Sequence, residues 1–337
     1  MKFGIGQPVV RQEDQRFLTG KGRYVDDIAL PGQAHGYVLR SPHAAAKIVS
    51  IDAAAARAAA GVLLVLTGAD LEAAGVGPVA CLVQPMAFGG SPPRHWPVRP
   101  ALAADQVRHV GDPVAFVVAE TRDQAEDAAE AIEVEYEERA ANVVTADALA
   151  EGAPKVWDDA EDNFCFSIER GDKAATEAAF RGAAHVVELD LTINRVSPST
   201  LEPRAAAATV DPVDGRITLY TSSQNPHGLR ASLARDVFRV PETQIRVVSP
   251  DVGGGFGMKN NTFPEDVLAI HAARTLGRPV RWTATRSEAM LADHHGRDVA
   301  CRAALALDAE GRILGLRVAA TYALGAYLAN SGPELAR

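Results

Sequence analysis

Cysteine is scarce in this chain. Only Cys81, Cys165 and Cys301 occur among its 337 residues, and no two of them form a C-x-x-C pair. A disulfide framework, a structural zinc site and an iron–sulfur cluster all need cysteines at closer spacing. We therefore expect all three to be small core residues, since free cysteine is among the most buried residue types. Any redox cluster must then belong to another polypeptide.

The chain also lacks an excess of positive charge and any long apolar run. Its 34 Lys and Arg residues against 43 Asp and Glu residues give a formal net charge of −9. This balance argues against a nucleic-acid partner, which would require a basic face. No apolar run is long enough to cross a bilayer, and the N-terminus has no apolar signal core. The sequence thus predicts a cytoplasmic protein without a membrane span, with export alongside a signal-bearing partner left open.

What is present is an ordinary globular composition, 47% apolar and 23% charged, at a length that allows two domains. In the first half, short apolar runs alternate with helical patches. Predicted strands lie at 38–39, 48–52, 62–66, 107–110, 114–118 and 132–136, and predicted helices at 53–60 and 122–131. Thr121 precedes the second helix as an N-cap residue. Strands and helices that alternate along the sequence in this way indicate an α/β or α+β fold.

The second half continues the mixture after a long Pro- and Gly-rich loop at 83–100 and an acidic connection at 137–162. Strands are predicted at 184–189 and 216–221, with hairpin turns at 214–215 and 308–312. A helix is predicted over 264–276. Pro264 stands in its first turn, Glu265 and Asp266 lie at its positive end, and Gly277 ends it.

The segment 249–260, SPDVGGGFGMKN, carries the clearest local signal. Four of its glycines fall within five residues, directly after a strand-like run at 245–248. Such a loop lets main-chain N–H groups converge on an anion or oxo ligand. A dinucleotide fingerprint fails because its third glycine would be Met258, and a P-loop fails because Met258 and Asn260 flank Lys259. Taken alone, the loop is equally compatible with a flexible hairpin.

A second motif changes this interpretation. The predicted strand at 216–221 runs into TSSQNPH at 221–227, some thirty residues before the glycine-rich loop. Together the two motifs resemble the molybdenum-binding large subunit of the xanthine dehydrogenase, aldehyde oxidase and carbon monoxide dehydrogenase family. Further stretches that fit the family in register lie at 22–27, 40–44, 61–70, 110–114, 201–204, 282–288 and 293–298.

The resemblance implies an α+β fold. Residues 1–18 would form an N-terminal extension and residues 19–140 an α/β hammerhead domain. A linker would follow at 141–162, and residues 163–337 would form the first, incomplete part of an α+β molybdopterin-binding domain. The resemblance covers only the front half of the family's length.

The family resemblance also assigns roles to single residues. Gln224 would hydrogen-bond an oxygen ligand of the molybdenum, because a neutral amide donates without adding charge. Gly254, Gly255, Phe256 and Gly257 would contact the cofactor, Phe256 through its main chain and as an aromatic wall of the substrate channel. Purine-oxidising members carry a glutamate where this chain has Asn260. Asn260 and Phe256 are therefore the candidate substrate contacts, with aldehydes, other N-heterocycles or a small gas favoured over purines.

Three further residues invite other interpretations. His294 and His295 have no spaced partners for a metal site, so we do not expect them to ligate one. Glu202 is expected to form a structural ion pair with Arg204 near the Gln224 turn, and not to act as a general base.

The function implied is that of a molybdenum hydroxylase subunit. It would oxidise an aldehyde, N-heterocycle or similar small molecule with water as oxygen source, using molybdopterin in its cytosine dinucleotide form. Electrons would pass to iron–sulfur and FAD subunits, and a separate chain would supply the C-terminal half. That half carries the family's catalytic base, so no catalytic residue is assigned here. The alternative is a non-catalytic fragment or assembly subunit that docks the iron–sulfur partner without metal.

Overall fold

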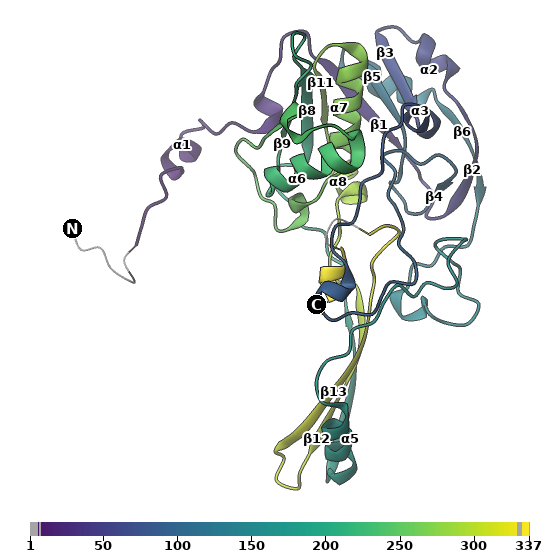
Figure 1. Ribbon diagram of the computed structural model, residues 1–337, viewed down its shortest axis with the longest axis vertical. Helices are drawn as coiled ribbons and strands as arrows, with labels where there is room; N and C mark the ends of the chain where they lie inside the picture. Colours follow the sequence, from purple (N-terminus) through teal and green to yellow (C-terminus); the bar gives the residue numbers. More distant parts are fainter. Residues whose placement is uncertain (1–5, 7, 329–331, 337) are drawn as a thin grey trace.

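The computed structural model describes residues 6, 8–328 and 332–336. It has a broad upper body and a narrow extension below it, and the N-terminal segment leads away from the body (Figure 1). Within the described residues, no helix has the length and apolarity that a bilayer crossing would need.

A seven-stranded sheet forms the frame of the upper body. Its strand order is β10 (Ile245–Val248), β9 (Ile217–Thr221), β8 (Ala205–Val210), β11 (Val280–Thr283), β1 (Ala34–Arg40), β5 (Pro113–Ala119) and β3 (Val62–Thr67). The halves meet where β1 pairs in parallel with β11. The sheet therefore takes strands from both sides of the predicted linker at 141–162, so the domain division stays a prediction.

Both faces of this sheet are covered by helices. On β5, Phe116 and Val118 point into the core under α7 (Pro264–Leu276), whereas Val117 points into a second core against α4 (Arg122–Glu130). This alternation is the period-2 geometry of a strand buried on both sides. The alanines of β8 at 205–208 are buried, and α7 lies against that strand.

The predicted helix at 264–276 is confirmed as α7. Pro264 occupies its first turn, and the Asp266 carboxylate accepts a hydrogen bond from the Phe263 N–H at 3.2 Å. Most of its residues are buried, and the helix packs against strands β8 and β11 of the sheet. The predicted N-cap Thr121 is also confirmed, since its hydroxyl accepts from the Gln124 N–H.

The remaining elements flank this frame. A three-stranded sheet is built from β2 (Ala46–Asp52), β4 (Gln106–Val107) and β6 (Glu133–Glu138). Shorter helices are α1 (Asp14–Leu18), α2 (Ala54–Ala58), α3 (Gly68–Ala73), α6 (Pro226–Ser232) and α8 (Arg286–Ala292), and a π-helical turn spans Leu233–Phe238. Single 3-10 turns lie at Val25–Asp27, Pro85–Phe88, Thr145–Asp147, Glu242–Gln244, Met258–Asn260 and Gly332–Ala336.

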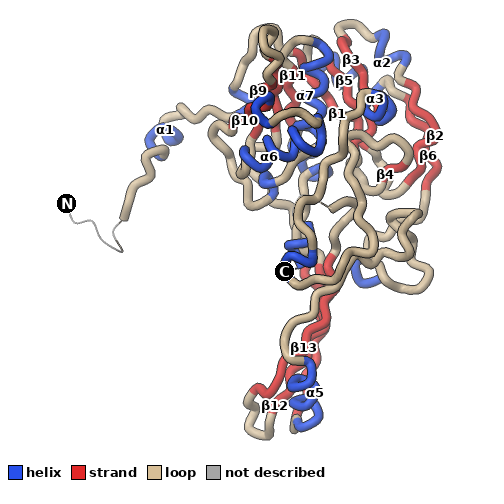
Figure 2. The backbone as a smooth tube through the Cα atoms, in the orientation of Figure 1, coloured by secondary structure: helices blue, strands red, loops and turns tan. Residues whose placement is uncertain are grey.

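The narrow extension is a separate three-stranded antiparallel sheet, which we call the tongue. It consists of β7 (His185–Ile193), β12 (Val299–Leu307) and β13 (Ile313–Tyr322), together with helix α5 (Lys173–Gly182) (Figure 2). The predicted hairpin turn at 308–312 connects β12 to β13.

Several predictions from the sequence need correction. The strand predicted at 107–110 ends at Val107, because the Arg108 N–H donates to the Asp112 carboxylate and starts a turn. The N-terminal extension, for which no helix was predicted, contains helix α1. Of the cysteines only Cys81 is buried. Cys165 and Cys301 are half-buried, the latter on the tongue.

A buried ion network ties the two halves of the sheet together. Glu265, at the start of α7, is bound at 2.6 Å both by Arg40 of β1 and by Arg204, which precedes β8. Arg204 also binds Asp293 at 2.6 Å, and Arg40 binds Glu288 at 2.7 Å. Burial alone would raise the pKa of Glu265, but the charges of Arg204 and Arg40 hold it well below its usual range. Each charge in the network is thus matched inside the protein.

Replacing Arg204 tests this network. Arg204→Met keeps the aliphatic volume but leaves Asp293 and part of Glu265 without a buried countercharge. We expect the free energy of unfolding to fall by about 3–5 kcal/mol, measured by urea denaturation. Arg235→Ala, which removes an exposed pair with Asp236, should change it by less than about 1 kcal/mol. Equal losses in both variants would contradict the assignment.

The neighbouring Asp266 predicts a pH dependence. Burial raises its pKa to about 6, so the folded state binds this proton more tightly than the unfolded chain does. The stability of the wild type relative to Asp266→Asn should therefore decrease as pH rises from about 4 to about 6, and level off above that. The decrease is on the order of 3 kcal/mol, at 1.36 kcal/mol per pKa unit. Unfolding curves that stay parallel across this window would show that Asp266 is ionised throughout.

Candidate functional site

The two predicted motifs meet at one edge of the seven-stranded sheet. β9 and β10 are parallel neighbours, with Tyr220 opposite Val248. The segments that follow them, the Gln224 turn and the glycine-rich loop, therefore leave the sheet at the same edge. Ser249 fastens them together: its hydroxyl donates to the Ser223 carbonyl at 2.9 Å and accepts from the Ser223 N–H at 3.2 Å.

The Gln224 side chain is oriented by the loop. Its Oε1 accepts a hydrogen bond from the Gly257 N–H at 2.9 Å, and its own backbone N–H donates to the Lys259 carbonyl at 2.9 Å. Only the oxygen of an amide can accept from an N–H group, so the Nε2 group points away from Gly257. Gln224 is exposed. Its two N–H donors are therefore available to an external acceptor.

Two glycines of the loop are required by close approach. A Cβ on Gly255 would lie 2.5 Å from Cδ of Gln224, and one on Gly253 would lie 2.4 Å from Cβ of Glu202. A side chain at Gly253 would push the loop away from Glu202, and one at Gly255 would displace the Gln224 side chain. The absence of side chains thus keeps the backbone against Gln224.

The crest of the loop, residues 254–257, is half-exposed to exposed and has main-chain N–H groups that are unpaired among the described residues. Within the described part of the chain, the N–H groups of Gly254, Gly255 and Phe256 have no recorded hydrogen-bond acceptor. Phe256 adopts a left-handed backbone conformation with φ of 48°, which is rare for a bulky residue and signals local strain. Its side chain is 78% exposed. Three successive free N–H groups beside an exposed ring suit an anion or an oxo group next to a small organic molecule.

The partner predicted for Glu202 was wrong. Its carboxylate binds Lys259 Nζ at 2.9 Å and accepts from the Gly253 N–H at 2.8 Å, while Arg204 belongs to the buried network. Lys259 Nζ also donates to the Glu202 carbonyl, and its side chain is fully buried. Burial lowers the pKa of Lys259, and the Glu202 carboxylate opposes that shift. Glu202 thus holds both ends of the glycine-rich loop.

The N-terminal segment is attached to the same loop. The Asp251 carboxylate is paired with Arg16 and accepts from the Arg23 N–H at 2.7 Å, while the Asp251 N–H donates to the Arg23 carbonyl. The hydrogen bond from Arg16 lowers the pKa of Asp251. Neither this attachment nor the clasp of Glu202 and Lys259 was predicted. Both pairs join residues more than fifty positions apart, so no local pattern could have revealed them.

The other candidate residues lie at different places. Asn260 is exposed at the end of the loop, and its N–H donates to the Gly257 carbonyl at 3.3 Å.

The Nε2 atom of His294 lies 2.6 Å from a guanidinium nitrogen of Arg99. Because a guanidinium can only donate, the His294 Nε2 atom is the acceptor. Burial and then the charge of Arg99 lower the pKa of His294 well below its usual value. His295 contacts the Met290 carbonyl instead.

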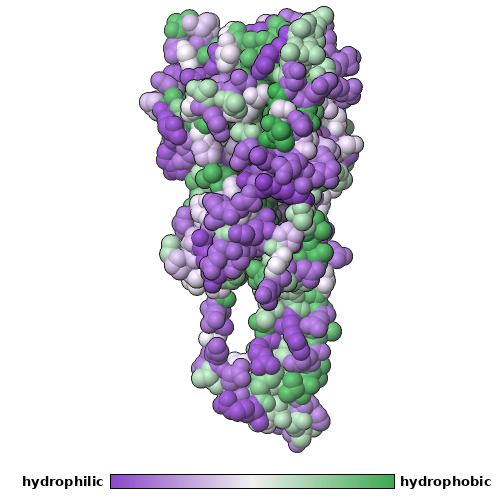
Figure 3. All heavy atoms as spheres, turned by 90° about the vertical axis from the view of Figure 1, so that its right-hand side faces the viewer, coloured by the Kyte–Doolittle hydropathy of each residue, from purple (hydrophilic) through white to green (hydrophobic). Residues whose placement is uncertain are grey.

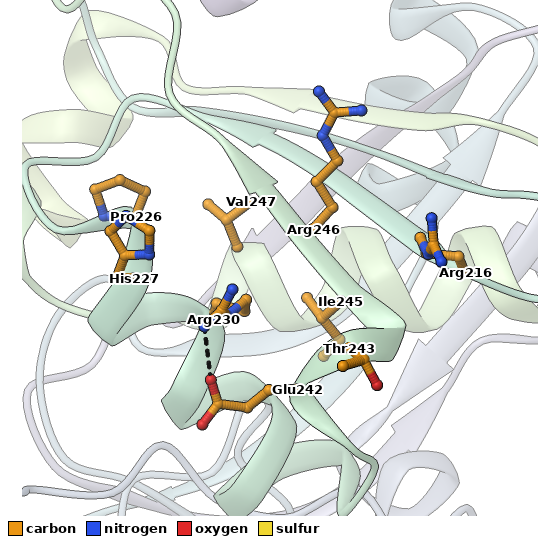
Figure 4. Close-up of a pocket in the computed structure, with 9 residues that line it drawn as sticks. All are labelled: Arg216, Pro226, His227, Arg230, Glu242, Thr243, Ile245, Arg246 and Val247. Carbon is orange, nitrogen blue, oxygen red and sulfur yellow. Dashed lines mark hydrogen bonds and ion pairs between the residues drawn. The ribbon is translucent and has the colours of Figure 1, made fainter.

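A hollow beside α6 and β10 does not contain this site (Figure 4). It has a volume of about 260 Å³. Its lining residues are Arg216, Pro226, His227, Arg230, Glu242, Thr243, Ile245, Arg246 and Val247. Arg230 is paired with Glu242 at 2.9 Å. Gln224 and the glycine-rich loop form an exposed surface next to it and not a closed pocket.

Glu202→Gln tests the clasp on the loop. The change leaves the buried Lys259 ammonium without its countercharge, so we expect a loss of about 3 kcal/mol in the free energy of unfolding. Amide hydrogen exchange at Gly253 and Gly257 should accelerate, as read by NMR or mass spectrometry. Glu242→Gln, at an exposed pair, is the matched control and should leave exchange in the loop unchanged. Unchanged exchange in Glu202→Gln would show that the loop is held by other contacts.

Two family models match this chain. The model of the molybdopterin cofactor-binding domain matches residues 156–337, and that of the aldehyde oxidase and xanthine dehydrogenase a/b hammerhead domain matches residues 19–140. The first match alone covers more than half of the chain and includes Gln224 and the glycine-rich loop.

Individual relatives have the same fold in longer chains. The carbon monoxide dehydrogenase large chain of Hydrogenophaga pseudoflava is 37% identical, over 98% of this chain and 41% of its own length. The crystal structure of quinoline 2-oxidoreductase from Pseudomonas putida 86 is 40% identical with a TM-score of 0.84, over 95% of this chain and 39% of its own. A shorter relative, the nicotinate dehydrogenase large molybdopterin subunit of Eubacterium barkeri, is 29% identical, over 98% of this chain and 73% of its own.

This chain thus spans about two fifths of the length of the first two relatives. It belongs to the family of molybdenum-binding large subunits of xanthine dehydrogenase, aldehyde oxidase and carbon monoxide dehydrogenase, as a hammerhead domain followed by part of the molybdopterin-binding domain.

Proposed function

We propose that this chain forms part of the molybdenum pocket of a hydroxylase that oxidises a small molecule with water as the oxygen source. The observation that carries the proposal is the arrangement at the sheet edge. The Gln224 amide presents its N–H donors outward because the Gly257 N–H holds its oxygen. The neighbouring N–H groups of Gly254, Gly255 and Phe256 have no acceptor among the described residues.

These residues fit the molybdenum cofactor. Gln224 would donate to an oxygen ligand of the metal, and the backbone of Gly254, Gly255, Phe256 and Gly257 would lie against the cofactor. Neutral donors that are fixed before binding stabilise an anionic centre without reorganisation. The cofactor, in its cytosine dinucleotide form by our prediction, would supply the two-electron oxidation. The residues of this chain would bind it, orient it and hold its oxygen ligand.

The substrate side is formed by Phe256 and Asn260. The exposed Phe256 ring would cover one face of the substrate, and the Asn260 amide would donate to or accept from a polar atom. Relatives are named for carbon monoxide, quinoline and nicotine. An N-heterocycle or another small uncharged molecule is therefore a better candidate here than a purine, which the family binds with a glutamate at the position of Asn260.

Other polypeptides would complete the enzyme. With three widely separated cysteines in the sequence, the iron–sulfur clusters that accept electrons would reside on a partner subunit, and FAD on another. The catalytic base is expected in the part of the family's fold that this chain does not span. A separate chain would supply that part.

A non-catalytic role is the second candidate, because the described site is an exposed surface around Gln224 and contains no assigned catalytic base. In that case the hammerhead region would dock an iron–sulfur partner and no molybdenum would be held. Elemental mass spectrometry of the complex, purified through a tag on this chain, separates the two. The hydroxylase predicts about one molybdenum per chain, and the assembly role predicts none.

Gln224→Ala tests the site directly. Losing one preorganised donor to the metal's oxygen ligand should reduce kcat by about 10²-fold. Because Gln224 is exposed and makes one side-chain hydrogen bond, with the Gly257 N–H, the free energy of unfolding should fall by no more than about 1 kcal/mol. Gln244→Ala, at an exposed glutamine that precedes β10 and so lies at the opposite end of the parallel strands, is the control and should keep full activity. Wild-type turnover of Gln224→Ala in a metal-replete complex would remove Gln224 from the site.

A further inference from the structure

A small cavity lies among the residues that support the Gln224 turn. Its volume of about 10 Å³ is close to the smallest that holds one water molecule. Ser222, which stands two positions before Gln224, lines it together with Asn261, which follows the glycine-rich loop, and Trp282 of β11. The cavity is therefore bounded by three separate segments, and two of them adjoin the candidate site.

Each of these three side chains carries a polar atom that has no partner among the described residues. The atoms are the hydroxyl oxygen of Ser222, Oδ1 of Asn261 and Nε1 of Trp282. Hydrophilic side chains on the outer surface are open to solvent (Figure 3), but these three residues are only 5%, 8% and 2% exposed. Buried polar groups are nearly always hydrogen-bonded, because an unpaired one costs the free energy of its desolvation. Three such residues around one water-sized cavity indicate a bound molecule that pairs with all of them.

The chemistry of the three atoms defines that molecule. The indole N–H of Trp282 can only donate, and Oδ1 of Asn261 can only accept. The orientation of the Asn261 amide is set by its Nδ2 group, which donates to the Met258 carbonyl at 3.0 Å. The Ser222 hydroxyl can donate or accept. A water molecule that accepts from Trp282, donates to Asn261 and pairs with Ser222 makes three hydrogen bonds, the usual number for a buried water.

Ions suit the same cavity less well. A cation would face the Trp282 N–H and two cationic residues of the lining, Arg204 and Lys259. An anion would face Oδ1 of Asn261 and the carboxylate of Asp266, which belongs to the same lining and is buried. Like charges at short range repel strongly inside a protein. A small neutral molecule that both donates and accepts avoids both conflicts.

We propose that this cavity binds one ordered water molecule, held by Trp282, Ser222 and Asn261, and that this water fixes the Gln224 turn against the end of the glycine-rich loop. Ser222 leads into the turn, and Asn261 lies two positions after Lys259, whose carbonyl accepts from the Gln224 N–H at 2.9 Å. The water thus supports both partners of that hydrogen bond. Ser222 and Asn261 are positioning residues for Gln224. The water site follows from the cavity and its lining, whereas its effect on turnover rests on the proposed function.

A high-resolution crystal structure of the protein tests the water site itself. We expect one density peak in the cavity, within about 2.7–3.2 Å of the Ser222 hydroxyl oxygen, Asn261 Oδ1 and Trp282 Nε1. A cavity without density would overturn the proposal, as would side chains turned so that the three atoms pair with protein groups. A peak that anomalous scattering identifies as a metal ion would overturn it as well.

Two alanine variants test whether the water holds the turn. Ser222→Ala removes one of its three partners. Ser232→Ala is the matched control, because the Ser232 hydroxyl on α6 is also buried and unpaired among the described residues but does not line the cavity. We expect amide exchange at Gln224, measured by NMR, to accelerate about tenfold in Ser222→Ala, which corresponds to the loss of one hydrogen bond. Ser232→Ala should exchange like the wild type. Equal rates in all three proteins would overturn the positioning role.

Turnover in the metal-replete complex tests the consequence for the site. The kcat of Ser222→Ala should lie between those of the wild type and Gln224→Ala, because the amide is kept but less well placed. Ser232→Ala should keep the wild-type kcat. A wild-type kcat for Ser222→Ala beside a reduced one for Gln224→Ala would overturn the positioning role and leave the proposed function intact. A wild-type kcat for Gln224→Ala would refute the proposed function, and the density and exchange rates would still decide the water site.

Discussion

The position of Glu265 between two arginines is the constraint on which the rest of the structure depends. Its carboxylate binds Arg40 from the N-terminal strands and Arg204 from the C-terminal strands, at the start of the helix that lies against the shared sheet. A buried carboxylate is costly unless each oxygen has a charged or polar partner. The two halves must therefore meet at one relative position, and this position places β8, β9 and β10 where the site is built.

The candidate site is likewise held by an ion pair between residues far apart in sequence. Glu202 and Lys259 clasp the ends of the glycine-rich loop, while Gln224 and Gly257 hold its crest. The loop carries a strained Phe256 and two glycines that leave no room for side chains. Such a backbone stays in place only when its surroundings determine it. The ends of the loop are thus fixed, while the N–H groups of Gly254, Gly255 and Phe256 have no acceptor among the described residues.

The tongue has two faces of different chemistry. One carries cross-strand ion pairs and is partly covered by α5, whereas the other carries exposed apolar side chains such as Leu189 and Leu316. The glycine-rich loop likewise forms an open surface and not an enclosed pocket.

The amino-acid sequence by itself determined the local elements and the identity of the motifs. Pro264, the acidic first turn and Gly277 specify α7, because the ends of a helix depend on neighbouring residues. The two motifs at 221–227 and 249–260 carry the resemblance to the family. Tertiary structure alone decided which charges pair. Glu202 binds Lys259 and not the nearby Arg204, because Arg204 is drawn into the network around Glu265. It also decided that the alternating residues of three strands far apart in sequence form one apolar face, since their register depends on contacts that no local pattern encodes.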